Sequence, residues 1–338
     1  MNYKAYKLKQ GKYPQTIVPT DGSMVLDAAP GGMAFLEGQL EKIDPKLREP
    51  LSSTWWPRDI VAKTGGGFVE YTSSYDVSYA TSGSNENGII GGQTNDIPVM
   101  QADISKDLYK VFSWGHILKV PFVDQQKLQK IGHNLEEILN KGLKLTHDKT
   151  IDINVYEGFA SYGTYGLINN PNVTTITAAE GAGSETTWKD KTPDEILTDL
   201  NDAITATWEA SEYDLSGMAN HILIPPAQYG YIVKQKVSDD ASKSILSYLL
   251  ENNIGKEQGI DLFIGPLPML KGAGTGSTDR MIAYVNNEDK VRFSMTVPLS
   301  RTMVEQSVMQ MSYLSAFVAQ FGQVEFLYYQ PVIYVDGI

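Results

Sequence analysis

The feature that most limits the possible folds of this chain is an alternating run at residues 69–79. Apolar and aromatic side chains occupy odd positions, namely Val69, Tyr71, Tyr75, Val77 and Tyr79. Polar side chains fill the even positions, namely Glu70, Thr72, Ser74, Asp76 and Ser78. A repeat of two is that of a β-strand with one aromatic face. A turn-rich segment at 82–88 and a second extended run at 97–120 follow, which predicts a long hairpin.

A two-stranded ribbon of this kind is only marginally stable alone in water, so it must lie against something. One interpretation is an ordinary hairpin that packs on its own domain. The other is a hairpin that lies across another subunit. Residues 64–105 contain no Lys or Arg but five acidic residues, Glu70, Asp76, Glu86, Asp96 and Asp103.

A long helix is predicted after the hairpin, over about 124–158, with Asp124 as its N-cap. About 30 helical residues would span roughly 45–50 Å. His133 and His147 lie on this segment and are interpreted as surface or helix-packing residues. An earlier short amphipathic helix is predicted at 33–43, ended by Pro45.

The middle of the chain has the pattern of one α/β domain. Its clearest local signal is Thr192-Pro193-Asp194-Glu195, a capping box with Pro at the first helical position. Strand-like and helical runs then alternate, and 281–285 and 291–295 are predicted to form a hairpin. Two long closing strands are predicted at 307–319 and 324–335.

The first 30 residues have no periodic apolar pattern, and four lysines, Lys4, Lys7, Lys9 and Lys12, precede the first acidic residue. A solvated flexible terminus is one interpretation. An arm that docks on a neighbouring subunit or an acidic partner is the other. No signal peptide or spanning helix is indicated, so a cytosol-like compartment is expected.

Composition excludes several kinds of site. The 338 residues include no Cys, which excludes disulfides, thiolate metal sites and a Cys nucleophile. The four His are scattered, which argues against a metal centre. With 28 Lys and Arg against 40 Asp and Glu, the net charge of −12 argues against a nucleic-acid-coating surface.

No catalytic constellation is found. The Gly-rich segment 272–278 lacks the Gly-Lys-Ser/Thr ending of a phosphate loop and precedes a strand rather than a helix. There is no Gly-x-Ser-x-Gly elbow. Trp55-Trp56 and the 19 Tyr could form a carbohydrate platform, but packing or subunit contacts are the simpler explanation, because Tyr and Trp are favoured at interfaces. We therefore expect no enzyme activity, no cofactor and no metal.

The order of the segments resembles that of the major capsid proteins of tailed bacteriophages, with the fold named after phage Hong Kong 97. The resemblance covers most of 30–338 and rests on the residues 166–173 (GLINNPNV), 192–197 (TPDEIL), 221–229 (HILIPPAQY), 244–249 (SILSYL) and 322–325 (GQVE). It implies an α+β chain that self-assembles into the icosahedral shell around a double-stranded DNA genome, without sequence-specific binding of that DNA and without a membrane.

The resemblance also implies a division into domains. Residues 1–30 would be an N-terminal arm, and 64–110 an extended loop that reaches over a neighbouring subunit. A peripheral domain would comprise 31–63, 111–165 and 307–338, with the predicted helix at about 124–158 as its spine. Residues 166–306 would form the axial domain. Candidate inter-subunit contacts are Lys4, Lys7, Lys9, Lys12, Glu70, Asp76 and Glu86.

Copies of the chain would form pentamers and hexamers in the virion after assembly in the host cytoplasm, with portal and decoration proteins as further partners. Two departures from the family are informative. Some members crosslink subunits through a Lys of the extended loop, and 64–105 has none. Fewer than 65 residues precede the hairpin, without heptads, so scaffolding is expected from a separate protein. An encapsulin-type compartment is the nearest alternative, and a soluble enzyme or carbohydrate-binding protein is a more remote one.

Overall fold

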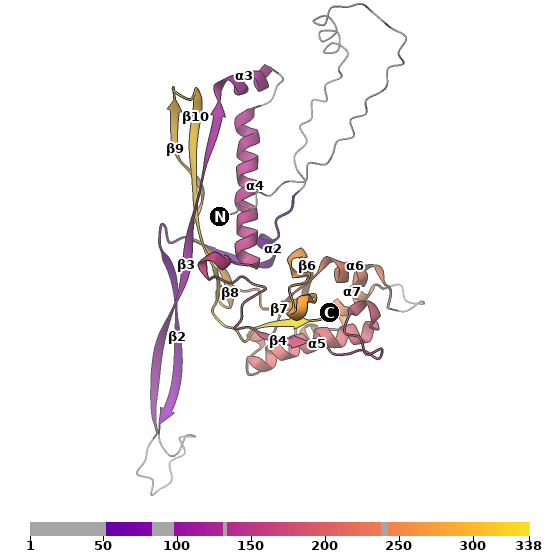
Figure 1. The fold of residues 1–338 in the computed structure, drawn as a ribbon. Helices are drawn as coiled ribbons and strands as arrows, with labels where there is room; N and C mark the ends of the chain where they lie inside the picture. The colour runs from indigo at the N-terminus through magenta and orange to yellow at the C-terminus, as the bar shows by residue number, and fades with distance from the viewer. Residues whose placement is uncertain (1–51, 83–97, 131–133, 238–242) are drawn as a thin grey trace, which may run out of the picture.

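The computed structural model describes residues 52–82, 98–130, 134–237 and 243–338 (Figure 1). The predicted arm, the helix at 33–43, Glu86, His133 and the tip of the hairpin lie outside the described residues. Within the described residues, the strands form three sheets. An elongated four-stranded sheet runs alongside helix α4, and a five-stranded sheet lies beyond one end of that helix (Figure 1).

The elongated sheet has the order β2-β3-β10-β9. Its strands are β2 Tyr71–Ser82, β3 Val99–Pro121, β9 Val297–Ser307 and β10 Ser312–Gly322. Strand β3 pairs with β2 from Val99 to Lys110 and with β10 from Val111 to Pro121. The predicted hairpin is therefore confirmed, and its second strand continues without a break into the sheet.

Helix α4, Leu135–Tyr156, packs on one face of this sheet, with Leu118, Val120 and Leu143 in the contact. The prediction of one helix over about 124–158 is wrong. A separate helix α3, Phe122–Lys130, precedes α4, and Asn134 between them has an extended backbone and caps the amide of Glu136. The apolar stripe indicates helix on both sides but does not show this break. The 22 residues of α4 span about 33 Å.

The five-stranded sheet has the order β4-β12-β7-β5-β6. Its strands are β4 Thr174–Thr177, β5 His221–Ile224, β6 Phe263–Pro266, β7 Arg280–Tyr284 and β12 Val332–Asp336. The helices that follow in this part of the chain are α5 Pro193–Ala210, α6 Pro226–Lys234, α7 Ile245–Glu251 and α8 Ile254–Glu257. The capping box of Thr192 and Glu195 at the start of α5 is confirmed.

A third sheet, with the order β1-β8-β11, lies between these two. Its strands are β1 Val61–Thr64, β8 Val291–Met295 and β11 Val324–Phe326, and the short helix α2, Trp56–Asp59, precedes β1. The predicted hairpin of 281–285 with 291–295 is wrong, because both edges of β7 are occupied by β5 and β12, while β8 pairs with β1 and β11.

The predicted closing strands are also corrected. The segment 324–335 forms two strands in different sheets, with β11 beside β8 and β12 between β4 and β7. By strand pairing, 332–336 therefore lies with the α/β part of the chain, and 297–307 lies with the elongated sheet. Both differ from the boundaries expected for the peripheral and axial domains.

Candidate functional site

The outer part of the hairpin projects from the rest of the molecule (Figure 1). Within the described residues, β2 pairs only with β3. One face of this ribbon is apolar and exposed, and we call it the ribbon face. It consists of Tyr71, Tyr75, Val77, Tyr79, Met100, Ile104 and Leu108. Their exposed fractions run from 49 to 72%, so this face has no cover within the described chain.

The register explains why these side chains gather on one side. Val77 lies opposite Ile104, and the odd residues of β2 pair throughout with even residues of β3. Cross-strand partners in a sheet point to the same face. An exposed apolar strip on a monomer of this kind marks an interaction surface.

Two lysines interrupt the ribbon face. Lys106 lies opposite Tyr75, with its Nζ atom 5.6 Å from the centre of the Tyr75 ring. Lys110 donates a hydrogen bond from Nζ to the main-chain oxygen of Tyr162 at 2.6 Å. The hairpin thus carries cations just beyond the cation-free stretch 64–105, and they are not among the contact residues predicted from the sequence.

The opposite face of the ribbon is polar and acidic. Asp76 and Asp107 are diagonal neighbours there, since Asp76 pairs with Ser105 and Asp107 with Ser74. Burial, together with a hydrogen bond and the negative charge of Asp107, raises the pKa of Asp76. Glu70 is exposed at the start of the ribbon. The predicted contact residues Lys4, Lys7, Lys9, Lys12 and Glu86 lie outside the described residues, so the structure does not bring them together with Glu70 and Asp76.

A second exposed apolar group lies where β9 turns into β10, at the other end of the elongated sheet from the ribbon (Figure 1). We call it the turn group, and it consists of Met303, Val304, Val308, Met309 and Met311. None of these residues was predicted from the sequence to be a contact residue. The two apolar groups are separated by the length of the sheet, so one chain cannot cover one with the other.

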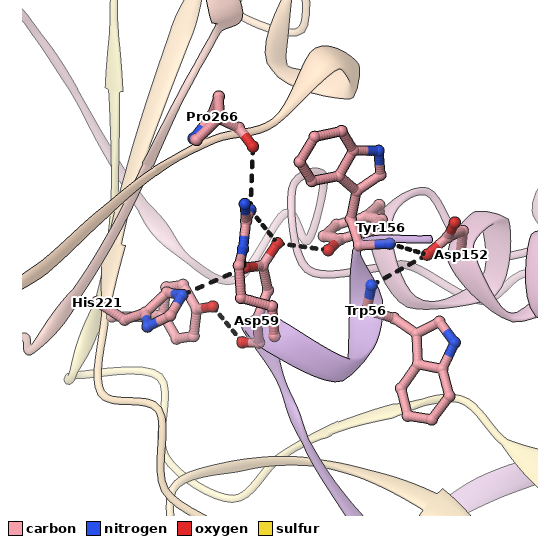
Figure 2. A network of polar contacts seen from close by, with 9 residues as sticks. Trp56, Asp59, Asp152, Tyr156, His221 and Pro266 are labelled. Carbon is pink, nitrogen blue, oxygen red and sulfur yellow. Dashed lines mark hydrogen bonds and ion pairs between the residues drawn. The ribbon is translucent and has the colours of Figure 1, made fainter. Parts of the chain in front are cut away.

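The interior holds a polar network around Asp59, which resembles a catalytic cluster in its residue types (Figure 2). The carboxylate of Asp59 accepts hydrogen bonds from Arg58 at 2.5 and 2.9 Å and from the Tyr156 hydroxyl at 2.6 Å. His221 Nε2 lies 3.4 Å from the same carboxylate, and the Tyr284 hydroxyl donates to the Asp59 main-chain oxygen.

The pKa values in this network fit a structural role. Burial alone would raise the pKa of Asp59, but hydrogen bonds from His221, Arg58 and Tyr156 outweigh it and hold the pKa below its ordinary value. Burial and the negative charge of Asp59 raise the pKa of Tyr156. Asp59 and Tyr284 have no exposed surface, so no substrate can reach them. The network joins α2, α4 and the five-stranded sheet.

The same region accounts for the two tryptophans considered as a carbohydrate platform. Trp55 and Trp56 are half-buried against the core, and their amides donate to Asp152 Oδ1 at 3.0 Å each (Figure 2). The Arg58 guanidinium covers the ring of Trp55 at 4.9 Å. These indoles therefore serve packing. In the described parts of the chain, no group of three or more His, Cys, Asp or Glu could hold a metal ion, and no helix is long and apolar enough to cross a membrane.

Comparisons with known proteins point to one family. The family model described as major capsid protein matches residues 85–338. The chain is similar in structure to the capsid of Myoviridae phage XM1, with a TM-score of 0.74 at 16% identity over 94% of this chain and 100% of that one. Microbacterium phage Oxtober96 gives 0.59 at 11% identity over 90% and 98%.

A third similar structure is the capsid of a native GTA particle, with a TM-score of 0.56 at 9% identity over 91% of this chain and 99% of that one. At these identities the likeness shows the fold alone. A search of the curated proteins found no match.

Proposed function

Since the chain belongs to the major capsid protein family, we propose that its copies build the shell of a tailed phage head by laying the ribbon face of one subunit on the next. The membership itself gives the function of a phage capsid protein that self-assembles. The ribbon face carries the rest of the proposal, because its seven apolar side chains are not covered by any described part of the chain and the ribbon pairs there only within itself.

Burial of the ribbon face would contribute a favourable free energy to assembly. Fully burying one large apolar side chain is worth about 1.5–3 kcal/mol. Seven side chains that are half to three-quarters exposed therefore offer on the order of 10 kcal/mol per subunit, before the costs of association are subtracted. Many such contacts, repeated by symmetry, hold a closed shell.

We assign the parts of the chain accordingly. The elongated sheet with α4 would be the peripheral domain and α4 its spine. The five-stranded sheet with α5, α6 and α7 would be the axial domain, and β2 with the outer half of β3 the extended loop. Pentamers and hexamers, enclosed double-stranded DNA, separate scaffolding and portal proteins, and assembly in the host cytoplasm are parts of the same proposal. A non-enzymatic role follows from the family.

Two further assignments concern charge. The lysines of 1–30, Lys4, Lys7, Lys9 and Lys12, would meet carboxylates of a neighbouring subunit, and Glu70, Asp76 and Glu86 would contribute to such contacts. An encapsulin-type compartment is less well supported, because the matching family is that of major capsid proteins and the phage XM1 capsid covers nearly the whole chain.

Two single substitutions at adjacent positions test the ribbon face. Val77→Lys places an ammonium on the ribbon face, and Ser78→Lys places the same charge on the polar face, opposite Asp103. We expect Val77→Lys to abolish particles in negative-stain microscopy and Ser78→Lys to form them, with equal melting temperatures of the unassembled subunits. Particles from Val77→Lys at the wild-type concentration, or equal loss in both variants, would contradict the proposal. A wild-type protein that stays monomeric or dimeric under all conditions would contradict the assembly itself.

A further inference from the structure

The root of the hairpin is the point at which β3 changes partner, between Lys110 and Val111. Toward Pro121, β3 pairs with β10, and toward Val99 it pairs, within the described residues, only with β2. The direction of the whole ribbon is therefore decided by contacts at the root. The effect of these contacts on assembly rests on the proposed function, whereas their effect on the direction of the ribbon does not.

Glu325, on β11, supplies a charged contact at the root. Its carboxylate is completely buried and accepts hydrogen bonds from three groups. Thr72 Oγ1 on β2 and Arg292 Nε on β8 each donate at 2.6 Å, and the Ser294 hydroxyl also donates. Hydrogen bonds to an ionised acceptor are roughly twice as strong as neutral ones. Thr72 thus ties the ribbon to a carboxylate that the third sheet already holds in place.

Two further groups of contacts hold the root, one at Val69 and one at Tyr109, the cross-strand partner of Thr72. Together with the hydrogen bond from Thr72 to Glu325, we call them the clamp. The Gln320 side chain accepts from the Val69 amide at 3.1 Å and donates to the Val69 carbonyl at 2.8 Å, like a strand pairing. The Tyr109 hydroxyl donates to the Phe326 carbonyl at 3.2 Å. Both strands of the ribbon are therefore fixed at the root, to β10 and to β11.

Small movements at the root are amplified along the ribbon. The ten residue-to-residue steps from Thr72 to Ser82 extend about 33 Å at about 3.3 Å per step. Each additional 10° or so of play at the root would thus move the far end of β2 by about 6 Å, which exceeds the spacing between neighbouring strands. A ribbon free at its root would have to be ordered during docking, and ordering has an entropic cost.

We propose that Glu325 is a positioning residue that, through Thr72, fixes the direction in which the hairpin leaves the sheet and so prepares the ribbon face for docking on a neighbouring copy. Glu325 is itself buried inside the subunit and contributes no surface to the contact. Its role is to hold the subunit in the docking conformation before it meets a partner.

Pulsed electron paramagnetic resonance on the full chain tests this directly. The protein has no Cys, so Ala80→Cys near the end of β2 and Lys144→Cys on α4 provide a single pair of spin labels. Distances are measured below the concentration of assembly. We expect a narrow distribution in the otherwise wild-type chain and one at least twofold wider with Thr72→Val, which removes only the hydroxyl. Glu325→Gln is the second variant. Ser78→Ala, on the same polar face of β2 but away from the root, is the matched control that also removes a hydroxyl.

In unlabelled proteins, Thr72→Val should raise the subunit concentration needed for assembly by roughly 3- to 10-fold, with Ser78→Ala close to wild type. An unchanged distance distribution in both Thr72→Val and Glu325→Gln would overturn the proposal. So would a widened distribution with unchanged assembly, since positioning would then not aid docking. A failure of the proposed function would be seen separately, as normal assembly of Val77→Lys. In either case the distance measurement shows whether the contacts at the root fix the direction of the ribbon.

Discussion

Truncation of one side chain on the ribbon face allows the contribution of this face to be measured. Ile104 is 66% exposed and lies directly opposite Val77. Ile104→Ala removes three carbon groups, each worth about 0.8 kcal/mol when buried. Scaled by the exposed fraction, docking should lose about 1.6 kcal/mol per subunit. Since 1.4 kcal/mol corresponds to a factor of ten, the concentration needed for assembly should rise roughly tenfold.

Ile117 provides a matched control, because it is the same residue type on the same strand with a similar exposed fraction, 71%. It does not belong to the ribbon, since it lies in the part of β3 that pairs with β10. The assay is light scattering of a dilution series, with particle counts by negative-stain microscopy and thermal unfolding of the dissociated subunit. We expect Ile104→Ala to shift the assembly threshold while Ile117→Ala shifts it much less, and neither should alter subunit melting. Equal shifts in both variants would refute the reasoning, since any exposed apolar side chain would then promote association.

Three further predictions concern charge and the chain terminus. Reversal to Lys of Glu70, Asp76 and Glu86 should impair assembly more than subunit melting, as microscopy and thermal unfolding would show, and equal losses would mean that the hairpin belongs to its own subunit's core. Asp59→Asn should cost about 3–5 kcal/mol at pH 7, because it removes one partner of a buried ion pair. The pKa of Asp59 is lowered in the folded protein, so its ionisation stabilises the fold above the unfolded pKa of about 3.9, and this stabilisation is lost as the pH falls through the folded pKa. The free energy of unfolding in urea should therefore depend less on pH in that range for Asp59→Asn than for the wild type. Deletion of residues 1–30 should leave a folded subunit by circular dichroism but block or alter assembly, and normal particles would count against a docking arm.

Local chemistry decided which elements could be predicted from the sequence. The alternation at 69–79 defines a strand whatever surrounds it, and the capping box at Thr192 and Glu195 marks a helix start by contacts within four residues. By contrast, Asn134 is compatible with either a helix interior or a new N-cap, and the apolar stripe continues through it. The periodicity alone therefore could not reveal that two helices meet there.

The errors in the sheets have a different cause, because strand partners are set by the whole fold. The turn residues at 286–289 favour a hairpin between β7 and β8, yet both edges of β7 are filled from elsewhere in the chain. In the last segment a signal was available, since Pro331 lies within 324–335 and proline is excluded from the interior of a central strand. It separates β11 from β12.

The predicted contact residues emphasised charge, whereas one of the two exposed faces of the hairpin is apolar. The aromatic positions of β2 were visible in the sequence, but their exposure was not, because a strand pattern does not tell whether its apolar face meets the core or solvent. Their partners on β3, such as Ile104, could be found only from the register. Glu325 gave no signal, since nothing in the sequence connects it with Thr72, 253 positions away.

The lysines of the ribbon limit what the covering surface can be. Lys106 stands within the apolar strip beside Tyr75, so docking of the ribbon face would take its ammonium out of water. Burying an unpaired ammonium in an apolar contact costs far more free energy than the burial of one apolar side chain of the ribbon face contributes. The proposed docking would therefore require an apolar surface on the neighbouring copy with a carboxylate or carbonyl oxygen placed opposite Lys106. Lys110 does not require a polar partner on the neighbouring copy, because its ammonium already donates a hydrogen bond to the Tyr162 carbonyl of its own subunit. In the proposed docking, this single charge would favour one register of the ribbon on its neighbour, which an apolar strip alone would not select.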